Sequence, residues 1–434
     1  MAQRAIREYD AKTLLARHWP DFVGGPLRYP GRVVQVGPDT PLDGLAEKAP
    51  WLAGERLAVK PDVLAGRRGK HGLVLLDAGW EDARAWLLRM RGTTAVVGGV
   101  SGELTHFVVE PFIGTERQYY LAIRTERDRD DVLFSPAGGI DIEEHLDQVR
   151  TISVPVWPPR DAPDFGPLFD GQPEVPAQLH ASLAGFCAGI YRYFRALGFA
   201  FMELNPFTVH GGELWPLDLK ARLDDSARFE CGTLWGDVDF PAPFGRRLTP
   251  EERAVTRLDE RSGASLKLTV LNPAGRIWTM VAGGGASVVY TDTIADLGRA
   301  GDLGNYGEYS GNPSSDETYE YTRIVLDLLT RGSGADGPGG DGKCLIIGGG
   351  IANFTDVAAT FAGIIRALRE FAPRLRSSGV RVLVRRGGPN YREGLRLMRE
   401  LGGELGISID VYGPDTHMTR VIGLALGGAA NGGA

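Results

Sequence analysis

The sequence has few cysteines and no long apolar run. Only three of its 434 residues are cysteine (Cys187, Cys231 and Cys344), and none has the CxxC spacing of a zinc site or redox motif. Without a disulfide framework, we expect a reducing compartment. No apolar run approaches the roughly 18 residues that span a bilayer, and the charged start MAQRAIREYDAK lacks the apolar core of a signal peptide. We therefore expect a soluble cytoplasmic protein with no membrane partner.

The sequence also lacks a basic excess. It has 48 Lys and Arg against 55 Asp and Glu, a formal net charge of −7. This balance argues against a nucleic-acid partner, although a few local arginines and helix N-termini are enough to bind a small anion. Hydrophobic residues make up 43% and charged residues 24% of the chain, which argues against disorder and coiled coil. The length is sufficient for two or three domains.

Glycine is the abundant residue, at 60 of 434 positions, about twice its usual share. No periodic repeat accompanies it, so we expect these glycines in turns and in loops that approach ligands. The stretch FPAPFGRRLTPEE (240–252) predicts an irregular connection because it holds three prolines and a glycine. The expected organisation is a first domain over 1–245, a linker over 246–259, a second domain over 260–426 and a flexible tail over 427–434.

The two halves differ in their predicted elements. The first half mixes strand-like runs with one clear helix over 180–197, where apolar residues recur at helical spacing. In the second half, short apolar strands, glycine turns and helices repeat: RIWTMVAGGG, KCLIIGGG, VRVLVRRGG and ISIDVYG each precede a helical pattern. This alternation predicts an open parallel sheet covered on both faces. Ligands bind such sheets beyond the carboxyl ends of the strands, here at the glycine turns.

Two further glycine-rich motifs are interpreted as one flexible linker. GSGADG (332–337) fits the dinucleotide-binding pattern, but it follows a helix and precedes a strand, which reverses the required order. GPGGDGKC (337–344) resembles a phosphate-binding loop, but Cys344 replaces the Ser or Thr and the strand again comes afterwards.

A candidate metal site lies on a predicted hairpin. The glycines at 211–212 separate two strand-like runs and predict a two-residue turn. In that register Asn205 lies opposite Asp218 and Glu203 opposite Lys220, and all four share one sheet face because alternate residues point the same way. Carboxylate and amide oxygens suit Mg²⁺. The alternative is a solvated face of cross-strand pairs.

A candidate phosphate site follows the strand-like run LAVK. Lys60 ends this run, and the next loop carries Arg67, Arg68 and Gly69. A lysine aimed from a strand together with a basic glycine loop can hold nucleotide phosphates, whereas the alternative is an exposed basic loop, because the Walker spacing is absent. A further strand-like run ends at Pro111, a position suited to a hinge beside adenine.

A candidate anion site lies at two glycine junctions of the second half, MVAGGGASVV and IIGGGIANFTDVAA. Each places unpaired backbone N–H groups and the positive end of a helix at a glycine turn. Asn353 and Thr355 could instead be simple N-caps. Two such junctions, with Arg385 and Arg386 ending the adjacent strand, favour a pocket for a polycarboxylate or phosphate. EYSGNPS (308–314) adds another glycine turn.

Taken together, these segments resemble the ATP-citrate lyase family, both the smaller subunit of its two-subunit form and the N-terminal portion of its single-chain form. The resemblance runs from residue 6 almost to the C-terminus, and the two-subunit form is the closer match because the single-chain enzyme continues further. It implies an ATP-grasp fold followed by a succinyl-CoA-synthetase-type open parallel α/β (flavodoxin-like) domain. The segments that carry it are LAVKPD, RRGKHGLV, VVEPFI, MELNPF, WGDVDFPAPFGR, GRIWTMVAGGGASVVY, GNYGEYSGNPS, IIGGGIANFTDVAATF and VRRGGPNYREGLR.

The resemblance implies two sites and the cofactors ATP and Mg²⁺. Gln118 departs from the family, which usually has an acid here to bind the nucleotide ribose; Glu116 could replace it. The implied nucleotide-binding residues are Lys60, Arg67, Arg68, Gly69, Pro111, Ile113 and Gln118, with Asn205 and Asp218 as metal ligands. The implied citrate-binding residues are Gly283, Gly284, Ser310, Gly311, Asn353, Phe354, Thr355 and Arg386. Helix N-termini and a planar guanidinium suit the three carboxylates of citrate.

The family reaction converts citrate, CoA and ATP to acetyl-CoA, oxaloacetate, ADP and phosphate through a phosphohistidine, citryl phosphate and citryl-CoA. The resemblance places that histidine, the CoA site and the cleavage domain on a larger partner subunit. Accordingly, none of the seven histidines here stands in a nucleophile loop, and we expect no catalytic residue in this chain. One alternative is another acyl-CoA synthetase subunit, such as the succinyl-CoA synthetase β-chain. The other is a non-catalytic subunit that kept the fold, and Gln118 is the only residue that favours it.

Overall fold

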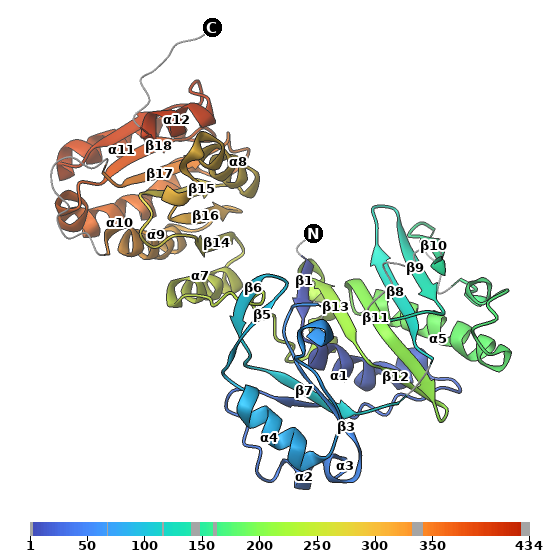
Figure 1. Ribbon diagram of the computed structural model, residues 1–434. Coiled ribbons are helices and arrows are strands. Elements are labelled where there is room, and N and C mark those ends of the chain that lie inside the picture. The colour runs from blue at the N-terminus through green and yellow to red at the C-terminus, as the bar shows by residue number, and fades with distance from the viewer. Residues whose placement is uncertain are drawn as a thin grey trace. The chain divides into compact units, whose positions relative to one another are not determined.

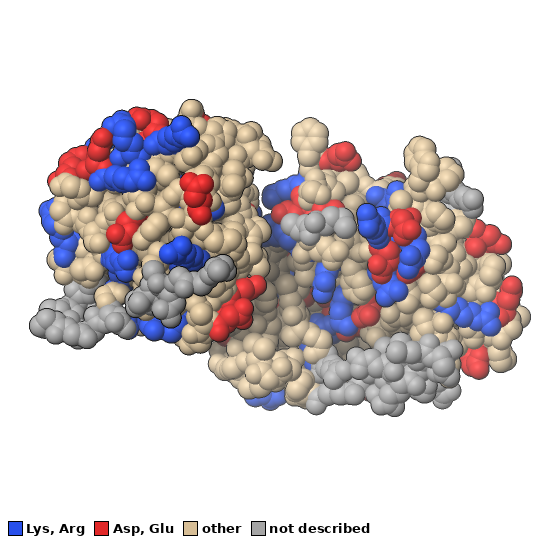
Figure 2. Space-filling view, turned by 90° about the horizontal axis from the view of Figure 1, so that it is seen from above, with Lys and Arg blue, Asp and Glu red and all other residues tan. Residues whose placement is uncertain are grey.

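The structure is a computed structural model that describes residues 3–66, 68–114, 117–139, 148–158, 163–331 and 342–426. The chain forms two compact units, Met1–Arg247 and Leu248–Ala434, each described by itself. The tail predicted over 427–434 and the motif at 332–337 lie outside the described residues. On the face shown in Figure 2, acidic and basic side chains intermingle on each unit.

A large antiparallel sheet forms the centre of the first unit (Figure 1). Helices α1 (Glu8–His18) and α5 (Ala177–Ala196) share one hydrophobic core with it. Helix α5 confirms the helix predicted over 180–197, because its buried residues recur at helical spacing. In spatial order the strands are β1 (Gln3–Ile6), β13 (Leu219–Asp224), β11 (Phe199–His210), β8 (Tyr119–Thr125), β9 (Arg129–Ser135) and β10 (Arg150–Pro155), with β12 (Glu213–Pro216) paired to β11.

A second, smaller sheet of this unit is covered by helix α4 (Trp80–Met90) over its own hydrophobic core. Its strands, in spatial order, are β2 (Val34–Val36), β7 (Phe107–Pro111), β3 (Leu57–Pro61) and β4 (Leu75–Ala78). This unit also contains the ribbon β5 (Thr94–Val97) and β6 (Val100–Glu103) and the short helices α2 (Leu45–Lys48), α3 (Trp51–Gly54) and α6 (Arg228–Trp235).

The hairpin predicted at 211–212 is confirmed. β11 and β12 pair from Phe207 with Pro216 to His210 with Glu213, and further along Glu203 pairs with Lys220 on β13. Both glycines at 211–212 have positive φ, which explains why a glycine pair occupies this turn. The register of the predicted metal site is therefore correct.

The irregular connection predicted over 240–252 is confirmed as far as Thr249, but it is wrong from residue 250 on, because Pro250–Arg261 form helix α7 within the range predicted as a linker (246–259). Thr249 accepts a hydrogen bond from the backbone N–H of Glu252, and the Glu252 side chain accepts one from the backbone N–H of Thr249. This capping box, with proline at the first helical position, starts the helix. Val255 of α7 is buried in the core of the second unit.

The second unit is an open sheet with helices on both faces, as predicted. One face carries α9 (Ser315–Thr330), α10 (Val357–Ser377) and α11 (Tyr391–Leu405), and the other carries α8 (Gly284–Ile294) and α12 (Met418–Ala425). Strand β14 is antiparallel and was not predicted. The spatial order is β14 (Ser265–Val270), β16 (Asn305–Ser310), β15 (Ile277–Ala282), β17 (Cys344–Gly349), β18 (Arg381–Arg385) and β19 (Ile409–Tyr412).

The five parallel strands of this sheet have the flavodoxin-like order 2-1-3-4-5, since β16 lies on one side of β15 and β17 on the other. Successive residues of β15 point to opposite faces: Trp278 and Met280 enter one core, and Ile277 and Val281 enter the other. Because β16 and β17 lie on opposite sides of β15, the order of the strands reverses at β15. The carboxyl ends of these strands meet at this switch point, which is where this fold binds ligands.

All three thiols of the chain are buried and unpaired. Burial raises the pKa of Cys187 and Cys231 and raises that of Cys344 to about 11. Among the helices that the structure describes, none is long and apolar enough to cross a membrane.

Candidate functional site

A buried charge cluster lies where α1, β3 and the turn after β3 meet in the first unit. Glu8, 5% exposed, accepts hydrogen bonds from Lys60 Nζ at 2.6 Å and Arg68 Nη2 at 2.7 Å, and its Oε1 lies 2.8 Å from Lys12 Nζ. Asp62 accepts the backbone N–H of Glu8 at 2.8 Å, which ties the start of α1 to the end of β3. The cluster thus fixes Lys60 and Arg68 from two directions.

Two more carboxylates complete the cluster. Glu110 on β7 lies 2.5 Å from Lys12 Nζ and 2.8 Å from Lys60 Nζ, and Asp218 Oδ1 accepts from Arg68 Nη2 at 2.9 Å. Burial raises the pKa of Glu8, but the surrounding cations outweigh it and hold this pKa well below its usual range. Burial lowers the pKa of Arg68, and its carboxylate partners reverse that shift. The Glu8 carboxylate and the Arg68 guanidinium are therefore both charged at neutral pH.

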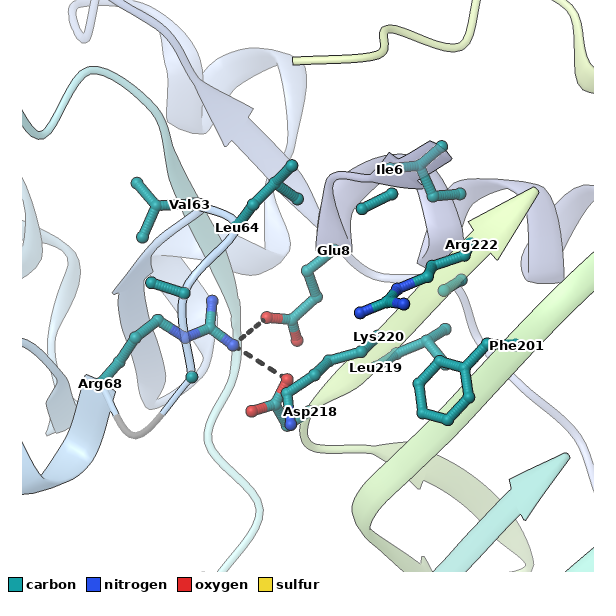
Figure 3. Close-up of a pocket in the computed structure, with 14 residues that line it drawn as sticks. Ile6, Glu8, Val63, Leu64, Arg68, Phe201, Asp218, Leu219, Lys220 and Arg222 are labelled. Carbon is teal, nitrogen blue, oxygen red and sulfur yellow. Dashed lines mark hydrogen bonds and ion pairs between the residues drawn. The ribbon is translucent and has the colours of Figure 1, made fainter. Parts of the chain in front are cut away.

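A cavity of about 230 Å³ opens beside this cluster (Figure 3). Of the residues predicted for the nucleotide and metal, Arg68 and Asp218 line it. Sequence reasoning assigned no site role to Glu8, Lys220 or Arg222, which also line it. The alternation of charged residues at 218, 220 and 222 could have indicated the last two, since alternate strand residues share a face. No local signal identifies Glu8, because its partners lie far away in the sequence.

The predicted metal ligands lie next to each other. The backbone N–H of Asn205 donates to the carbonyl of Asp218 at 3.0 Å. The Oδ1 atom of Asn205 accepts from the N–H of Gly139 at 2.7 Å. Glu203 and Lys220 form a cross-strand ion pair at 2.6 Å, as the alternative interpretation of this face expects. Within the described residues, no three acidic, histidine or cysteine side chains gather as a metal site.

The other residues predicted for the nucleotide lie around the cluster. Pro111 ends β7 directly after Glu110, and Ile113 follows two residues later. Gly69 belongs to the short helix Arg68–His71 that presents Arg68. Arg67 lies outside the described residues.

Gln118, which departs from the family pattern, lies near the predicted metal ligands. Its carbonyl accepts from the N–H of Gly138 at 2.8 Å, and a Cβ placed on Gly139 would lie 3.4 Å from its Oε1 atom. Because Gly139 also donates to Asn205, the turn at 138–139 connects the two predicted sites. The amide of Gln118 and the predicted metal ligand Asn205 thus both lie next to Gly139.

A second cavity, of about 300 Å³, lies in the second unit at the switch point of its sheet. It gathers residues that follow β15, β16, β17 and β18 in the sequence. Gly284, the first residue of α8, does not line the cavity itself but directly follows Gly283, which does. The other predicted citrate residues all line the cavity: Gly283, Ser310, Gly311, Asn353, Phe354, Thr355 and Arg386.

The buried guanidinium of Arg386 gives this cavity a positive charge. Arg386 is 3% exposed and donates to the carbonyl of Gly350 at 2.9 Å, while its buried Nε atom has no hydrogen-bond partner within the described chain. Arg385 is 5% exposed and donates to three backbone carbonyls at 2.7–3.1 Å. Because Arg386 is held by a neutral carbonyl and forms no ion pair among the described residues, its charge is available to an anion in the cavity.

The interpretation of Asn353 and Thr355 as simple N-caps is wrong. The N-cap of α10 is Asp356, whose side chain accepts from the N–H of Ala359 at 2.9 Å. Asn353 and Thr355 instead line the cavity, and Phe354 between them is 73% exposed. The side chains of this turn are therefore available to a ligand.

Sequence reasoning missed Tyr309, which also lines the cavity. Its side chain is 1% exposed and its hydroxyl has no partner within the described residues. Burial raises the pKa of Tyr309, against the opposing effect of Arg386. Tyr309 directly precedes the predicted Ser310, but on an alternating strand a neighbour is not expected on the same face, so no signal pointed to it.

Family models match both units. Residues 2–235 match the model described as "ATP-citrate synthase ATP-grasp domain", and residues 246–428 match the one described as "ATP citrate lyase citrate-binding". The fold and the two cavities thus define an ATP-grasp protein with a separate anion-binding domain.

Similar proteins are known from plants, animals and archaea. The chain is 47% identical over 421 residues to "ATP-citrate synthase alpha chain protein 2" of Arabidopsis thaliana, covering 97% of each. It is 44% identical to "ATP-citrate synthase" of Bos taurus, covering 98% of this chain but 38% of that one. A solved structure of ATP citrate lyase from Methanothrix soehngenii, in complex with citrate and coenzyme A, is 47% identical with a TM-score of 0.90, covering 98% of this chain and 100% of that one. The chain therefore belongs to the ATP-citrate synthase (ATP-citrate lyase) family and matches its alpha chain in extent.

Proposed function

We propose that this chain is the ATP- and citrate-binding subunit of an ATP-citrate lyase, which converts citrate, CoA and ATP to acetyl-CoA, oxaloacetate, ADP and phosphate. The observation that carries the proposal is the cavity at the switch point, where Arg386 is buried without a carboxylate partner. A tricarboxylate would supply the missing negative charge. The family match favours this function over that of a succinyl-CoA synthetase subunit.

The cavity offers citrate donors from several elements. The Arg386 guanidinium can bind one carboxylate through two parallel hydrogen bonds, because its Nε atom is free of other partners. Asn353 and Thr355 present side-chain donors, and the backbone at Gly283 and Gly284 leads into the positive end of α8. Each carboxylate of citrate thus has donors of its own.

In the first unit, Lys60 and Arg68 are the cations suited to nucleotide phosphates. Glu8 and Glu110 hold them in place, so they are oriented before the nucleotide arrives. Such preorganised charge is the main contribution a protein makes to phosphoryl transfer.

The residues at 205 and 218 fit a Mg²⁺ ion by the chemistry of their donors, which are oxygens of one amide and one carboxylate. Asp218 is only partly buried, at 27% side-chain exposure, and one of its oxygens faces Arg68. Mg²⁺ bound here would neutralise charge on the phosphates. Asn205 and Asp218 would hold the Mg²⁺ ion, and Arg68 would contact the nucleotide phosphates directly.

The phosphoryl acceptor belongs to another chain in this proposal. A larger subunit supplies the histidine that receives the phosphoryl group, the CoA site and the cleavage domain, and citryl phosphate and citryl-CoA follow. The match over 97% of the Arabidopsis thaliana alpha chain supports this division. The buried, unpaired thiols agree with the reducing cytosol, where we propose that the enzyme works.

A thermal-stability titration with citrate, succinate and Mg-ATP tests the citrate site. Citrate at 100 times its Kd should stabilise the chain by about 2.7 kcal/mol, and succinate at the same concentration should not. Arg386→Ala should abolish the response, whereas Arg369→Ala, which removes an exposed arginine of α10 paired with Glu404, should keep it. A preference for succinate would assign the chain to the synthetases. A citrate response that survives Arg386→Ala would remove this residue from the pocket.

Asp218→Ala tests the metal assignment. This variant should abolish ATP-dependent phosphorylation of the larger subunit's histidine while the fold is retained, because Asp218 is partly exposed. Asp128→Ala, at an aspartate that is 79% exposed, is the matched control. Unimpaired phosphorylation in Asp218→Ala would contradict the assignment. Absence of phosphorylation in the wild-type complex would favour the non-catalytic subunit that kept the fold.

A further inference from the structure

Three polar side chains stand on one face of β16, beside the citrate cavity. Ser310 Oγ donates to Glu308 Oε1 at 3.1 Å, and the Tyr306 hydroxyl donates to Glu308 Oε2 at 3.0 Å. They share the face because they alternate along the strand. Ser310 also lines the cavity, so Glu308 stands directly behind a wall of the pocket.

The Glu308 carboxylate also adjoins the first turn of α8. A Cβ placed on Gly284 would lie 3.1 Å from Oε1 and 3.2 Å from Oε2 of Glu308. A side chain at this position would require the carboxylate to shift by a few tenths of an ångström. Glu308 is therefore confined between β16 and the start of α8.

The direction of the bond from Ser310 to Glu308 follows from the chemistry of the two groups. An ionised carboxylate can only accept hydrogen bonds, and a serine hydroxyl has a single hydrogen to donate. The hydrogen of Ser310 is therefore used on Glu308, and its oxygen presents only lone pairs to the cavity. Toward a ligand, Ser310 acts as an acceptor.

This restriction decides which ligand group Ser310 can bind. Citrate carries three carboxylates, which accept, and one hydroxyl, which donates. The hydroxyl is the only group of citrate that can hydrogen-bond to Ser310, whereas a carboxylate there would meet lone pairs and the negative charge of Glu308. Elsewhere in the lining of the cavity, Arg386, Asn353 and Thr355 offer donors to the carboxylates.

We propose that Glu308 is a positioning residue which fixes Ser310 as a hydrogen-bond acceptor, so that the pocket selects a hydroxylated tricarboxylate over one that lacks the hydroxyl. This inference rests on the proposed citrate site and adds its selectivity. Ser310 contacts the substrate hydroxyl, and Glu308, which stands behind Ser310, acts by orienting the serine and by its negative charge, which disfavours a carboxylate at this position.

Calorimetric titration of the full chain with citrate and tricarballylate tests the proposal, because the two acids differ only in the hydroxyl. The wild-type protein should bind citrate at least about tenfold more tightly, the equivalent of one good hydrogen bond. Ser310→Ala should bring the ratio close to one by weakening citrate while tricarballylate binding changes little. Removal of one hydroxyl leaves the fold intact, so this variant remains informative if others do not fold.

Glu308→Gln separates positioning from a merely structural role. The glutamine amide can donate to Ser310, which frees the serine hydrogen to turn toward a ligand carboxylate. Tricarballylate should then bind more tightly than it binds the wild type, and the citrate preference should fall at least about threefold. Glu400→Gln, at an exposed glutamate of α11 paired with Arg396, is the control and should keep the wild-type ratio.

The outcomes distinguish this inference from the proposed function. Equal affinity of the wild type for both acids would overturn the inference and leave the citrate site standing. An unchanged ratio in folded Glu308→Gln would overturn the positioning role. Failure of the full chain to bind either acid would overturn the proposed function and the inference with it.

Discussion

Replacing Lys12 by methionine would remove one cation from the buried cluster of the first unit without changing the side-chain length greatly. The Lys12 ammonium is 1% exposed and lies 2.8 Å from a carboxylate oxygen of Glu8 and 2.5 Å from one of Glu110. In the variant Glu8 keeps Lys60 and Arg68 as partners, but Glu110 keeps Lys60 alone among the described residues. The buried carboxylate of Glu110 would thus lose one of its two positively charged partners.

The cost follows from burial rather than from distance. Breaking a buried ion pair by removing one partner costs about 3–5 kcal/mol, and the lower end applies here because each carboxylate keeps at least one cation. Lys220→Met is the matched control: its ammonium lies 2.6 Å from Glu203, but the side chain is 45% exposed. An exposed pair of this kind contributes about 0–1 kcal/mol.

Urea denaturation of both variants at neutral pH measures the difference. Lys12→Met should lower the free energy of unfolding by about 3 kcal/mol, equivalent to roughly 6–12 °C in Tm for a unit of this size. High salt should diminish the effect of Lys220→Met only, because it screens exposed charges. Two variants that agree within about 1 kcal/mol would refute the argument that the cluster is strongly coupled.

Two other perturbations test packing and titration. Gly363→Ala should lower the free energy of unfolding by about 1–3 kcal/mol, because its Cβ would lie 2.1 Å from the carbonyl oxygen of Ser315 where α9 and α10 touch. Gly403→Ala should raise the free energy of unfolding by up to about 1 kcal/mol, because its Cβ would meet nothing within 4 Å. Equal Tm shifts in the two variants would contradict this contrast. Burial and two neighbouring aspartates raise the pKa of Asp10 to about 7. The folded state therefore binds this proton more tightly than the unfolded state, and the free energy of unfolding should fall as the pH rises from about 4 to about 7. Asp10→Asn should flatten that pH dependence in denaturation curves, and an unchanged slope would show that Asp10 titrates normally.

Local signals were sufficient wherever neighbours in the sequence determine the structure. The glycines at 211–212 allow one tight turn, and the turn sets the pairing of Glu203 with Lys220. The repeated strand, glycine turn and helix likewise predicted the parallel sheet, whose strand order then brought the candidate citrate residues to one cavity. Sequence reasoning could therefore predict both the second unit and the position of its pocket.

Other features could not be predicted, either because they depend on residues far away in the sequence or because a stronger local pattern pointed to a different structure. The carboxylate of Glu8 meets Lys60 and Arg68, which are 52 and 60 residues away, so no local pattern reveals the cluster. The prolines before α7 suggested an irregular linker, although Thr249 and Glu252 are spaced as a capping box. Nor does a strand pattern show that β14 pairs antiparallel at the sheet edge, because that depends on the path of the chain as a whole.

The burial of the three thiols has a practical consequence. A thiolate is the reactive form of cysteine, and the raised pKa values of these groups keep them protonated and inaccessible near neutral pH. A single cysteine introduced at Phe229, which is 98% exposed, would therefore react alone with a thiol-directed dye. The wild-type sequence can thus carry a site-specific fluorescent reporter, and ligand-induced changes can be followed optically without first removing its own cysteines.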